Sequence, residues 1–257
     1  GTGGGGGGGQ QAASMVRTSI NSSLDEARKK GKLTQKEAME LMVKMMTLQR
    51  MEAKPNGAQP PNGAAGGAKA DDSSTCAGCT ANVAVVTPTE ILVANAGDSR
   101  AVIASNGGVV ALSKDHKPNL PEERERITKA GGWITDGATG HYRVNGNLNL
   151  SRSIGDLKYK TDTRIGPEAQ VVTAEPDVVR HTRTAQDEFL VLACDGIWDC
   201  MTNEEVAEFT RRRLREGAKC SEICEEIFTQ CLAEDPKQTA GIGGDNMTCI
   251  IVDLRPR

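Results

Sequence analysis

The chain has 257 residues, a formal charge of −3 and 25% charged residues, so it can bury one sizeable core but offers no basic field for nucleic acid or an anionic membrane surface. Its longest apolar run, residues 189–194, is far shorter than the roughly 20 residues that span a bilayer, and the N-terminus lacks the apolar core of a signal peptide. We therefore expect a soluble intracellular protein, in the cytoplasm or the nucleus, that binds neither nucleic acid nor membrane. The eight cysteines are expected to be reduced and mostly buried, because several fall inside expected strands and helices.

The first part of the chain changes composition three times. Residues 1–33 begin with a glycine tract that can bury nothing, so we expect them to be disordered. Residues 34–53 begin with Thr34 and Glu37 as a capping box and place four methionines near one face, which predicts an amphipathic helix packed on its own domain rather than on a partner. Residues 54–74 are rich in Pro, Gly and Ala and predict a loop.

From residue 75 the pattern becomes one of strands and turns. The β-rich runs CTANVAVV and EILVANA are separated by Thr-Pro-Thr at 87–89, and RAVIAS and VVALS flank Asn-Gly-Gly at 106–108, a strong hairpin signal. Together they predict an antiparallel meander.

The last part of the chain alternates strands with helices. EFLVLAC and MTCIIVD read as buried strands. Between them, a capping box at Thr202 and Glu205 begins one helix, and a second helical pattern follows. The apolar positions expected to be buried are Val206, Phe209 and Leu214 in the first helix and Ile223, Ile227 and Cys231 in the second. Strands in series followed by paired helices indicate a layered α+β domain.

Three aspartates share one setting, a glycine-containing turn beside a buried strand. They are Asp98 in NAGDSR, Asp195 in ACDGIWD and Asp245 in GGDNMT. Carboxylates held at strand ends suit hard divalent cations, which require oxygen ligands. Asp-Gly and Gly-Asp are also ordinary turn pairs, and the spacing alone does not show that the three side chains meet.

Eight sequence blocks occur in an order that resembles the metal-dependent protein serine/threonine phosphatases of the type 2C family. In chain order they are GCTA (78–81), VANAGDSRAVI (93–103), DHKP (115–118), ERITKAGGWI (125–134), RVNGNLNLSRSIGD (143–156), EPDV (175–178), LACDGIWD (192–199) and GGDNMT (243–248). The resemblance covers residues 75–257 and implies a four-layer α-β-β-α sandwich, that is, two antiparallel sheets flanked by helices.

The resemblance also implies a chemistry. Asp195 and Asp245 match ligands of the second catalytic Mg²⁺ or Mn²⁺ ion, and Asp98 matches, with Asp195, the ligands of a third, weaker ion. In the family, a metal-activated water attacks the phosphorus of phosphoserine or phosphothreonine in a protein substrate, without a phosphoenzyme. The site-supporting residues expected from the motifs are Gly196, Asn246, Ser153, Asp156 and Asp199.

The family's N-terminal motifs are not found before Cys76. These are a Glu-Asp pair after a phosphate-binding arginine, and an Asp-Gly-His-Gly-Gly turn that carries a metal-bridging Asp and a proposed general acid. We therefore expect a partial domain that lacks the family's N-terminal strands, and we identify no general acid in this chain. Two hypotheses follow: the protein is a phosphatase, or it is a catalytically inactive relative that serves as a binding or regulatory module.

Overall fold

The structure is a computed structural model that describes residues 77–136 and 142–255. The glycine-rich segment 1–33, the amphipathic helix expected over 34–53 and the loop over 54–74 lie outside the described residues. All the functional residues proposed above lie within them.

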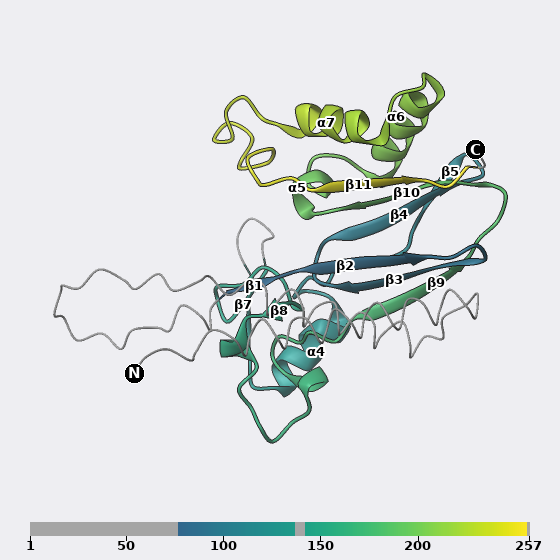
Figure 1. Ribbon diagram of the computed structural model, residues 1–257. Coiled ribbons are helices and arrows are strands. Elements are labelled where there is room, and N and C mark those ends of the chain that lie inside the picture. The colour runs from purple at the N-terminus through teal and green to yellow at the C-terminus, as the bar shows by residue number, and fades with distance from the viewer. Residues whose placement is uncertain (1–76, 137–141, 256–257) are drawn as a thin grey trace, which may run out of the picture.

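Two antiparallel sheets form the centre of the molecule (Figure 1). The first has the strand order β2-β3-β9 and the second the order β11-β10-β4-β5. Their strands are β2 (Ala81–Val86), β3 (Glu90–Ala96), β9 (Asp177–Thr182), β11 (Cys249–Asp253), β10 (Asp187–Ala193), β4 (Arg100–Ser105) and β5 (Gly108–Ala111). The strands predicted from the sequence are therefore confirmed, and β9 is an additional strand that begins within the EPDV block. The predicted meander is wrong, because the β2–β3 and β4–β5 hairpins belong to different sheets.

The turn between β4 and β5 is the predicted hairpin. Ser105 pairs with Gly108, which leaves Asn106 and Gly107 as a two-residue connection. Their φ angles are 52° and 77°, the left-handed conformation at both positions that a type I′ turn needs. Asn and Gly adopt this conformation at low cost, so the dipeptide sets the register of this edge of the sheet.

Strands β4 and β10 are buried on both faces. Ile103 and Leu190 point toward the first sheet, where they pack against Ile91 and Val93 of β3. The alternate residues Val102, Ala104, Phe189 and Val191 point the other way, into the core beneath the helices. Successive side chains of a strand project to opposite faces, so burial of both faces explains why these two strands are continuous apolar runs rather than alternating ones.

The helical layer covers the outer face of the four-stranded sheet (Figure 1). It consists of α5 (Asp195–Trp198), α6 (Asn203–Arg215) and α7 (Cys220–Cys231). Helix α6 begins at the predicted capping box, with reciprocal bonds between Thr202 and Glu205. The six apolar positions predicted to face the core in α6 and α7 are all buried, so the helical periodicity was sufficient to orient both helices.

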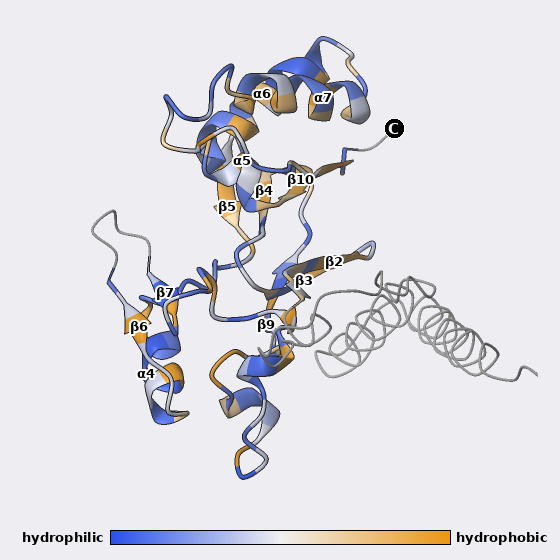
Figure 2. Cartoon of the chain, turned by 90° about the vertical axis from the view of Figure 1, so that its left-hand side faces the viewer, coloured by the Kyte–Doolittle hydropathy of each residue, from blue (hydrophilic) through white to orange (hydrophobic). Residues whose placement is uncertain are grey.

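A long excursion between β5 and β9 forms a smaller unit apart from the stacked sheets (Figure 2). It contains α4 (Pro121–Lys129), β6 (Ile134–Thr135), β7 (Arg143–Val144), β8 (Ile154–Gly155), η1 (Leu157–Tyr159) and η2 (Pro167–Ala169), and β8 pairs with β1 (Gly78–Cys79). Its core includes Ile127, Val144 and Val172.

One buried ionic group ties this excursion together. The carboxylate of Glu123 on α4 is fully buried and bonds to Arg152 at 2.6 Å and to Arg126 at 2.7 Å. Ser151 donates a further hydrogen bond at 2.5 Å. Burial opposes ionisation of Glu123, but these bonds and the two positive charges outweigh it and lower the pKa, so the group stays charged and paired.

The α+β sandwich predicted from the sequence is confirmed. Among the described residues, the helical layer of α5, α6 and α7 lies over the four-stranded sheet, and no described helix forms a matching layer over the three-stranded sheet. No helix in the described ranges is long and apolar enough to cross a membrane.

We predict that Leu190→Ala lowers the free energy of unfolding by about 2–5 kcal/mol, because it opens a cavity between two sheets that cannot close freely. Leu190 is 0% exposed. Urea unfolding of the full chain measures this change. The control is Val110→Ala on the edge strand, where the side chain is 52% exposed and a change within about 0.5 kcal/mol is expected; equal losses for the two variants would contradict the assigned core.

Candidate active site

Strand pairing brings the three predicted aspartates to one end of the four-stranded sheet. Asp98 lies just before β4, Asp195 directly after β10, and Asp245 a short loop before β11. Ala193, the last residue of β10, pairs with Arg100 of β4 on one side and with Cys249 of β11 on the other. Because antiparallel neighbours run in opposite directions, the end of β10 meets the starts of both neighbours.

Asp98 is the buried member of this group. It is 2% exposed, and its Oδ2 accepts a hydrogen bond from the Lys117 ammonium at 2.5 Å. Burial opposes the charge on Lys117, but Asp98, Asp199 and Asp195 outweigh it and raise the Lys117 pKa. Lys117 is therefore the cation that compensates the clustered carboxylates.

The charge on Asp195 is disfavoured in the folded protein. Burial is the largest cause of its raised pKa, and the negative charges of Asp98, Asp199 and Asp245 add to it, while Lys117 acts in the opposite direction. These four carboxylates are therefore close enough to repel one another. An additional cation at this place would relieve that repulsion.

The loop that carries Asp245 is held against the end of β10. Cys194 donates its backbone N–H to the Thr248 carbonyl at 3.2 Å, and the Thr248 N–H donates to the Cys194 sulfur at 3.2 Å. Asp245 itself is exposed, and one of its carboxylate oxygens accepts the Asn246 N–H at 2.7 Å. The loop presents the Asp245 side chain to solvent beside Asp195.

Gly196 makes this loop packing possible. A Cβ atom at Gly196 would lie 2.3 Å from the Asn246 carbonyl oxygen, a distance that backbone atoms cannot accommodate without moving. Asp199 lies one turn further along α5 and donates its backbone N–H to the Asp195 carbonyl at 2.8 Å. Among the predicted supporting residues, Gly196, Asn246 and Asp199 therefore lie at the site.

The other two predicted supporting residues brace a different place. The Ser153 hydroxyl donates to Asp156 at 2.6 Å, and the Asp156 N–H donates to the Ala77 carbonyl at 2.8 Å. These contacts join the β8 region to the start of β1. No contact of Ser153 or Asp156 with Asp98, Asp195 or Asp245 is recorded among the described residues, so both lie outside that group.

His116 supports the turn that carries Asp98. The Gly97 N–H donates to its Nδ1 at 3.1 Å, so Nε2 carries the proton and bonds to Asp177 at 3.1 Å. The bond to His116 is the largest cause that lowers the Asp177 pKa to about 2, and Arg152 also lowers it. His116 is buried, and both ring nitrogens are used in these contacts, which fits a structural role.

Two basic residues of the site were not singled out from the sequence. Lys117 balances Asp98, as described above. The Arg100 guanidinium donates to both oxygens of Asp115 at 2.9 and 2.8 Å and to Asn203 at 2.8 Å, and it lies 5.2 Å from the Trp198 ring centre. Both residues occur within the GDSR and DHKP blocks, which is the signal that could have identified them.

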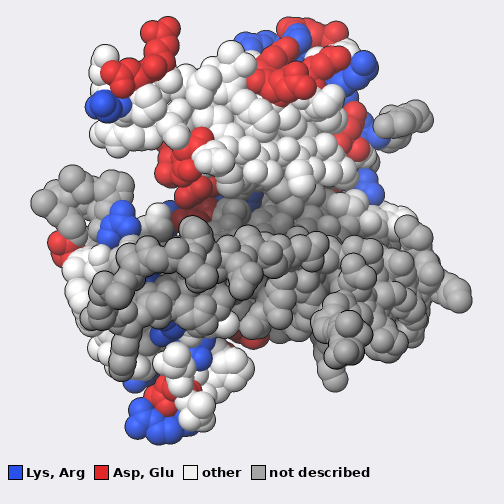
Figure 3. Space-filling model, turned by 60° about the vertical axis from the view of Figure 1, so that its left-hand side comes forward, with Lys and Arg blue, Asp and Glu red and all other residues white. Residues whose placement is uncertain are grey.

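The carboxylate oxygens of this site are ligands of the type that a hard divalent cation requires, but there are too few of them close together to bind one. All its members are carboxylates, and Figure 3 shows acidic side chains gathered at the indentation between the helix-bearing half of the molecule and the rest. No group of three His, Cys, Asp or Glu side chains within the described ranges is spaced to hold a metal ion. The described aspartates alone therefore do not make up a metal site, and a cation bound here would need further oxygen ligands.

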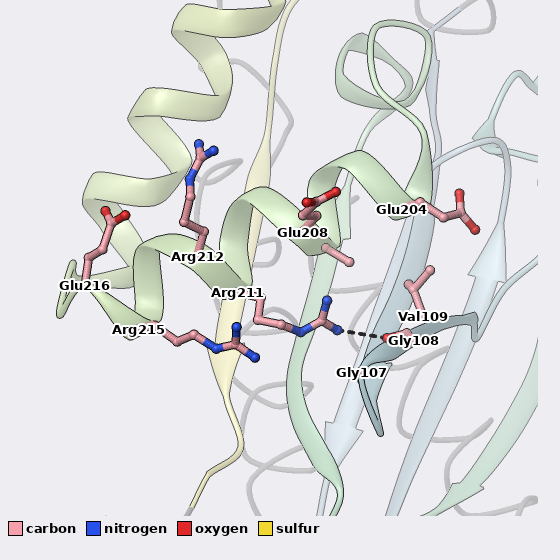
Figure 4. Close-up of a pocket in the computed structure, with 10 residues that line it drawn as sticks. Gly107, Gly108, Val109, Glu204, Glu208, Arg211, Arg212, Arg215 and Glu216 are labelled. Atoms are coloured by element: carbon pink, nitrogen blue, oxygen red, sulfur yellow. Dashed lines mark hydrogen bonds between the residues drawn. The ribbon is translucent and has the colours of Figure 1, made fainter.

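Two hollows border the four-stranded sheet, one at each end. One, of about 620 Å³, borders the site and is lined by Arg100, Asp115, Lys117 and Asn203 among others. The other, of about 750 Å³, lies between α6 and the β4–β5 hairpin, where Arg211 reaches the Gly108 carbonyl (Figure 4). The first hollow is the relevant one, because Lys117, which bonds to Asp98, lies in its wall.

Comparison with known proteins gives consistent matches. The family model described as protein phosphatase 2C matches residues 5–239, a range that begins well before the motif-bearing segment 75–257. Protein phosphatase 2C homolog 2 of Hypocrea jecorina (strain QM6a) is 49% identical over 175 residues, 68% of this chain and 39% of that protein. The probable protein phosphatase 2C 58 of Oryza sativa subsp. japonica is 46% identical over 189 residues, 74% of this chain and 50% of that protein. The chain thus spans half or less of the length of these curated relatives.

Solved structures show the same likeness. A crystal structure of a phosphatase from a pathogenic strain of Toxoplasma gondii is 34% identical, with a TM-score of 0.55, and the match covers 65% of this chain and 49% of that one. The serine-threonine phosphatase 2C from Toxoplasma gondii is 23% identical, with a TM-score of 0.57, and the match covers 70% and 60%. The second match supports the fold alone.

We predict that Asp195→Asn raises the melting temperature of the metal-free protein at neutral pH. The folded pKa of Asp195 is above its ordinary value, so the carboxylate destabilises the fold once pH rises above about 3.8, the ordinary pKa. Removing the charge removes that penalty. Calorimetry in EDTA at pH 7 tests it. The control is Asp162→Asn, which removes a carboxylate paired with Arg164 and should not raise the melting temperature; a lower melting temperature for Asp195→Asn would contradict the assigned repulsion.

We further predict that Gly196→Ala destabilises the protein by about 1–3 kcal/mol, because the new methyl group overpacks the Asn246 backbone. The matched control is Gly108→Ala. The nearest atom to a Cβ there is 3.7 Å away, which is ordinary contact, so this variant should be neutral or slightly stabilising. Urea unfolding compares the two. Similar stability for both variants would show that the loop tolerates displacement.

Proposed function

Because the chain belongs to the protein phosphatase 2C family, we propose that the protein it represents hydrolyses phosphoserine and phosphothreonine in protein substrates. The two curated relatives described above are both named as protein phosphatases 2C. The chain spans at most half of their length. The activity is therefore proposed for the whole protein, to whose active site this chain contributes Asp98, Asp195 and Asp245.

One observation carries the proposal. Four carboxylates that belong to family motifs lie at a single sheet end, and three of them raise the pKa of the fourth, Asp195. Such a group destabilises the fold, and perturbed carboxylates of this kind concentrate at functional sites. The family motifs and the repulsion among carboxylates both single out Asp98, Asp195, Asp199 and Asp245.

Asp195 and Asp245, with Asp98 beside them, would hold the Mg²⁺ or Mn²⁺ ions that the family uses. When bound, these ions supply an acidified water and neutralise the charge of the phosphate. The ion pair with Lys117 holds the Asp98 side chain in place. His116 fixes the preceding Gly97, so this carboxylate is positioned on rigid backbone.

The remaining residues orient the site. Arg100 links the start of β4 to Asn203 at the start of α6 and to Trp198 at the end of α5. The Asp195 turn and the helical layer are therefore joined through one guanidinium. Gly196 lets the Asp245 loop pack against α5. We propose that these contacts keep the two carboxylate-bearing turns at a constant separation.

The family's Asp-Gly-His-Gly-Gly motif does not occur in the sequence. A bridging carboxylate and a general acid are therefore not among the residues assigned here. The alternative of an inactive binding or regulatory module draws no support from the relatives described above, so the phosphatase is the favoured interpretation.

The decisive experiment measures Mn²⁺-dependent release of phosphate from a phosphothreonine peptide. This chain and a longer chain extended upstream of residue 1 are assayed in parallel, each also as Asp195→Asn. Loss of a direct metal ligand should lower activity by more than the roughly 10–100-fold that is typical when a hydrogen-bond partner of a ligand is lost. We expect activity in the extended chain and a loss of at least about 100-fold in its Asp195→Asn variant.

Asp162→Asn is the matched control, because Asp162 pairs with Arg164 on a loop outside the site and its loss should leave activity unchanged. A phosphotyrosine peptide tests the substrate class. Undiminished activity in the Asp195→Asn variant would overturn the proposal that Asp195 is a metal ligand. Absence of phosphate release from the extended chain with either peptide would overturn the proposed phosphatase function.

A further inference from the structure

Thiols are concentrated in the helical half of the molecule. Among the described cysteines, all of which are free, only Cys79 lies elsewhere. The others lie on or beside the strands and helices at this side of the sheet: Cys194, Cys200, Cys220, Cys224, Cys231 and Cys249. None of them is used by the proposed phosphatase chemistry.

Cys224 and Cys249 form a contact between a helix and a strand. Cys224 lies on α7 and Cys249 is the first residue of β11. The Cys224 thiol donates a hydrogen bond to the Cys249 carbonyl oxygen at 3.6 Å. Both side chains are half-buried and pack against the core beneath the helices. The pair is thus close in space, although 25 positions separate its members in the sequence.

The two sulfurs differ in acidity. The hydrogen bond from the Cys249 thiol is the largest cause that lowers the Cys224 pKa; burial opposes it, and the Ile251 N–H lowers it further. The same bond is the largest cause that raises the Cys249 pKa. The Cys224 thiol is therefore the more acidic of the two and the one that ionises first to a nucleophilic thiolate.

A second thiol pair in the same region provides an internal comparison. The Cys231 pKa is raised to about 12, first by burial and then by Cys200, and the Cys231 side chain is buried. Thiolate character and exposure govern the reaction of a cysteine with oxidants. The Cys200–Cys231 pair should therefore react more slowly than Cys224.

We propose that Cys224 and Cys249 are a redox modification site, which a hydroperoxide such as hydrogen peroxide converts to a disulfide between α7 and β11. The Cys224 thiolate attacks one peroxide oxygen, the O–O bond breaks, and the departing hydroxide takes up a proton to give water and a sulfenic acid. The Cys249 sulfur then attacks the Cys224 sulfur, the S–O bond breaks, and its oxygen leaves with the Cys249 proton as water. Two thiols and one peroxide yield one disulfide and two waters.

The disulfide would lie at the start of β11, where the loop that carries Asp245 ends. Cys249 follows Thr248, which is bonded to Cys194 beside Asp195. Linking Cys249 to α7 joins this strand covalently to the helical layer and restricts the unfolded chain between the two cysteines. Oxidation should therefore raise the melting temperature of the chain, and a thiol reductant should reverse the effect.

The test treats the full chain with hydrogen peroxide in EDTA, then blocks free thiols with iodoacetamide and maps peptides without reduction. Trypsin cuts after Lys219 and Lys237, and a glutamate-specific protease cuts after Glu222 and Glu225, so Cys224 separates from its neighbours on α7. We expect a linked pair of peptides that contain Cys224 and Cys249, about 2 Da lighter than the sum of the two thiol peptides, that is lost with dithiothreitol.

Cys220→Ser is the matched control on the same helix and should leave the linked peptides unchanged. Cys224→Ser should abolish them and leave Cys249 reduced. In Cys249→Ser, the sulfenic acid on Cys224 should persist and be trapped by dimedone, which keeps the test informative if one variant unfolds. Intact thiols in the oxidised wild-type chain, or linkage of Cys200 to Cys231 at an equal rate, would overturn the proposal.

Discussion

The antiparallel pairing of β4 with β10 is the constraint on which the rest of the molecule depends. Both strands are buried on two faces, so their register is strongly specified: a slip of one residue would exchange the two apolar faces. Ala193 at the end of β10 stands beside Arg100 at the start of β4. The turns that carry Asp98 and Asp195 follow directly from this pairing, so core packing determines where the carboxylates meet.

The same arrangement has an electrostatic cost. Asp195 is held among like charges in a partly buried position, and only Lys117 among the groups acting on it favours its charged form. Stability and the proposed function are in opposition here. The repulsion among the carboxylates destabilises the protein without a bound cation, and the same repulsion favours binding of a cation. The protein tolerates the cost because the surrounding turns are rigid. His116 holds Gly97, and Arg100 holds the end of the sheet against the helices.

The helical layer is more than a cover for the sheet. The loop after α7 returns to the carboxylate group and packs on α5 at Gly196, and β11 then runs beneath α7, where Cys249 meets Cys224. The geometry of the Asp245 loop is therefore shared between the sheet end and the helix. A covalent link at the cysteine pair would act on the same backbone segment that presents Asp245.

The sequence by itself determined the local features of this protein. Period-2 and period-3.6 apolar patterns, the Asn106-Gly107 turn and the capping box at Thr202 are consequences of residues close in the chain, and the structure confirms them. The family motifs singled out Asp98, Asp195 and Asp245 as candidate metal ligands. Only the tertiary structure decided that Lys117 bonds to Asp98, that His116 holds Gly97, that Asp156 bonds to Ala77 instead of joining the carboxylate group, and that Cys224 meets Cys249. Each of these contacts joins residues that are far apart or on different elements, and local periodicity contains no information about which strand ends the packed core will place side by side.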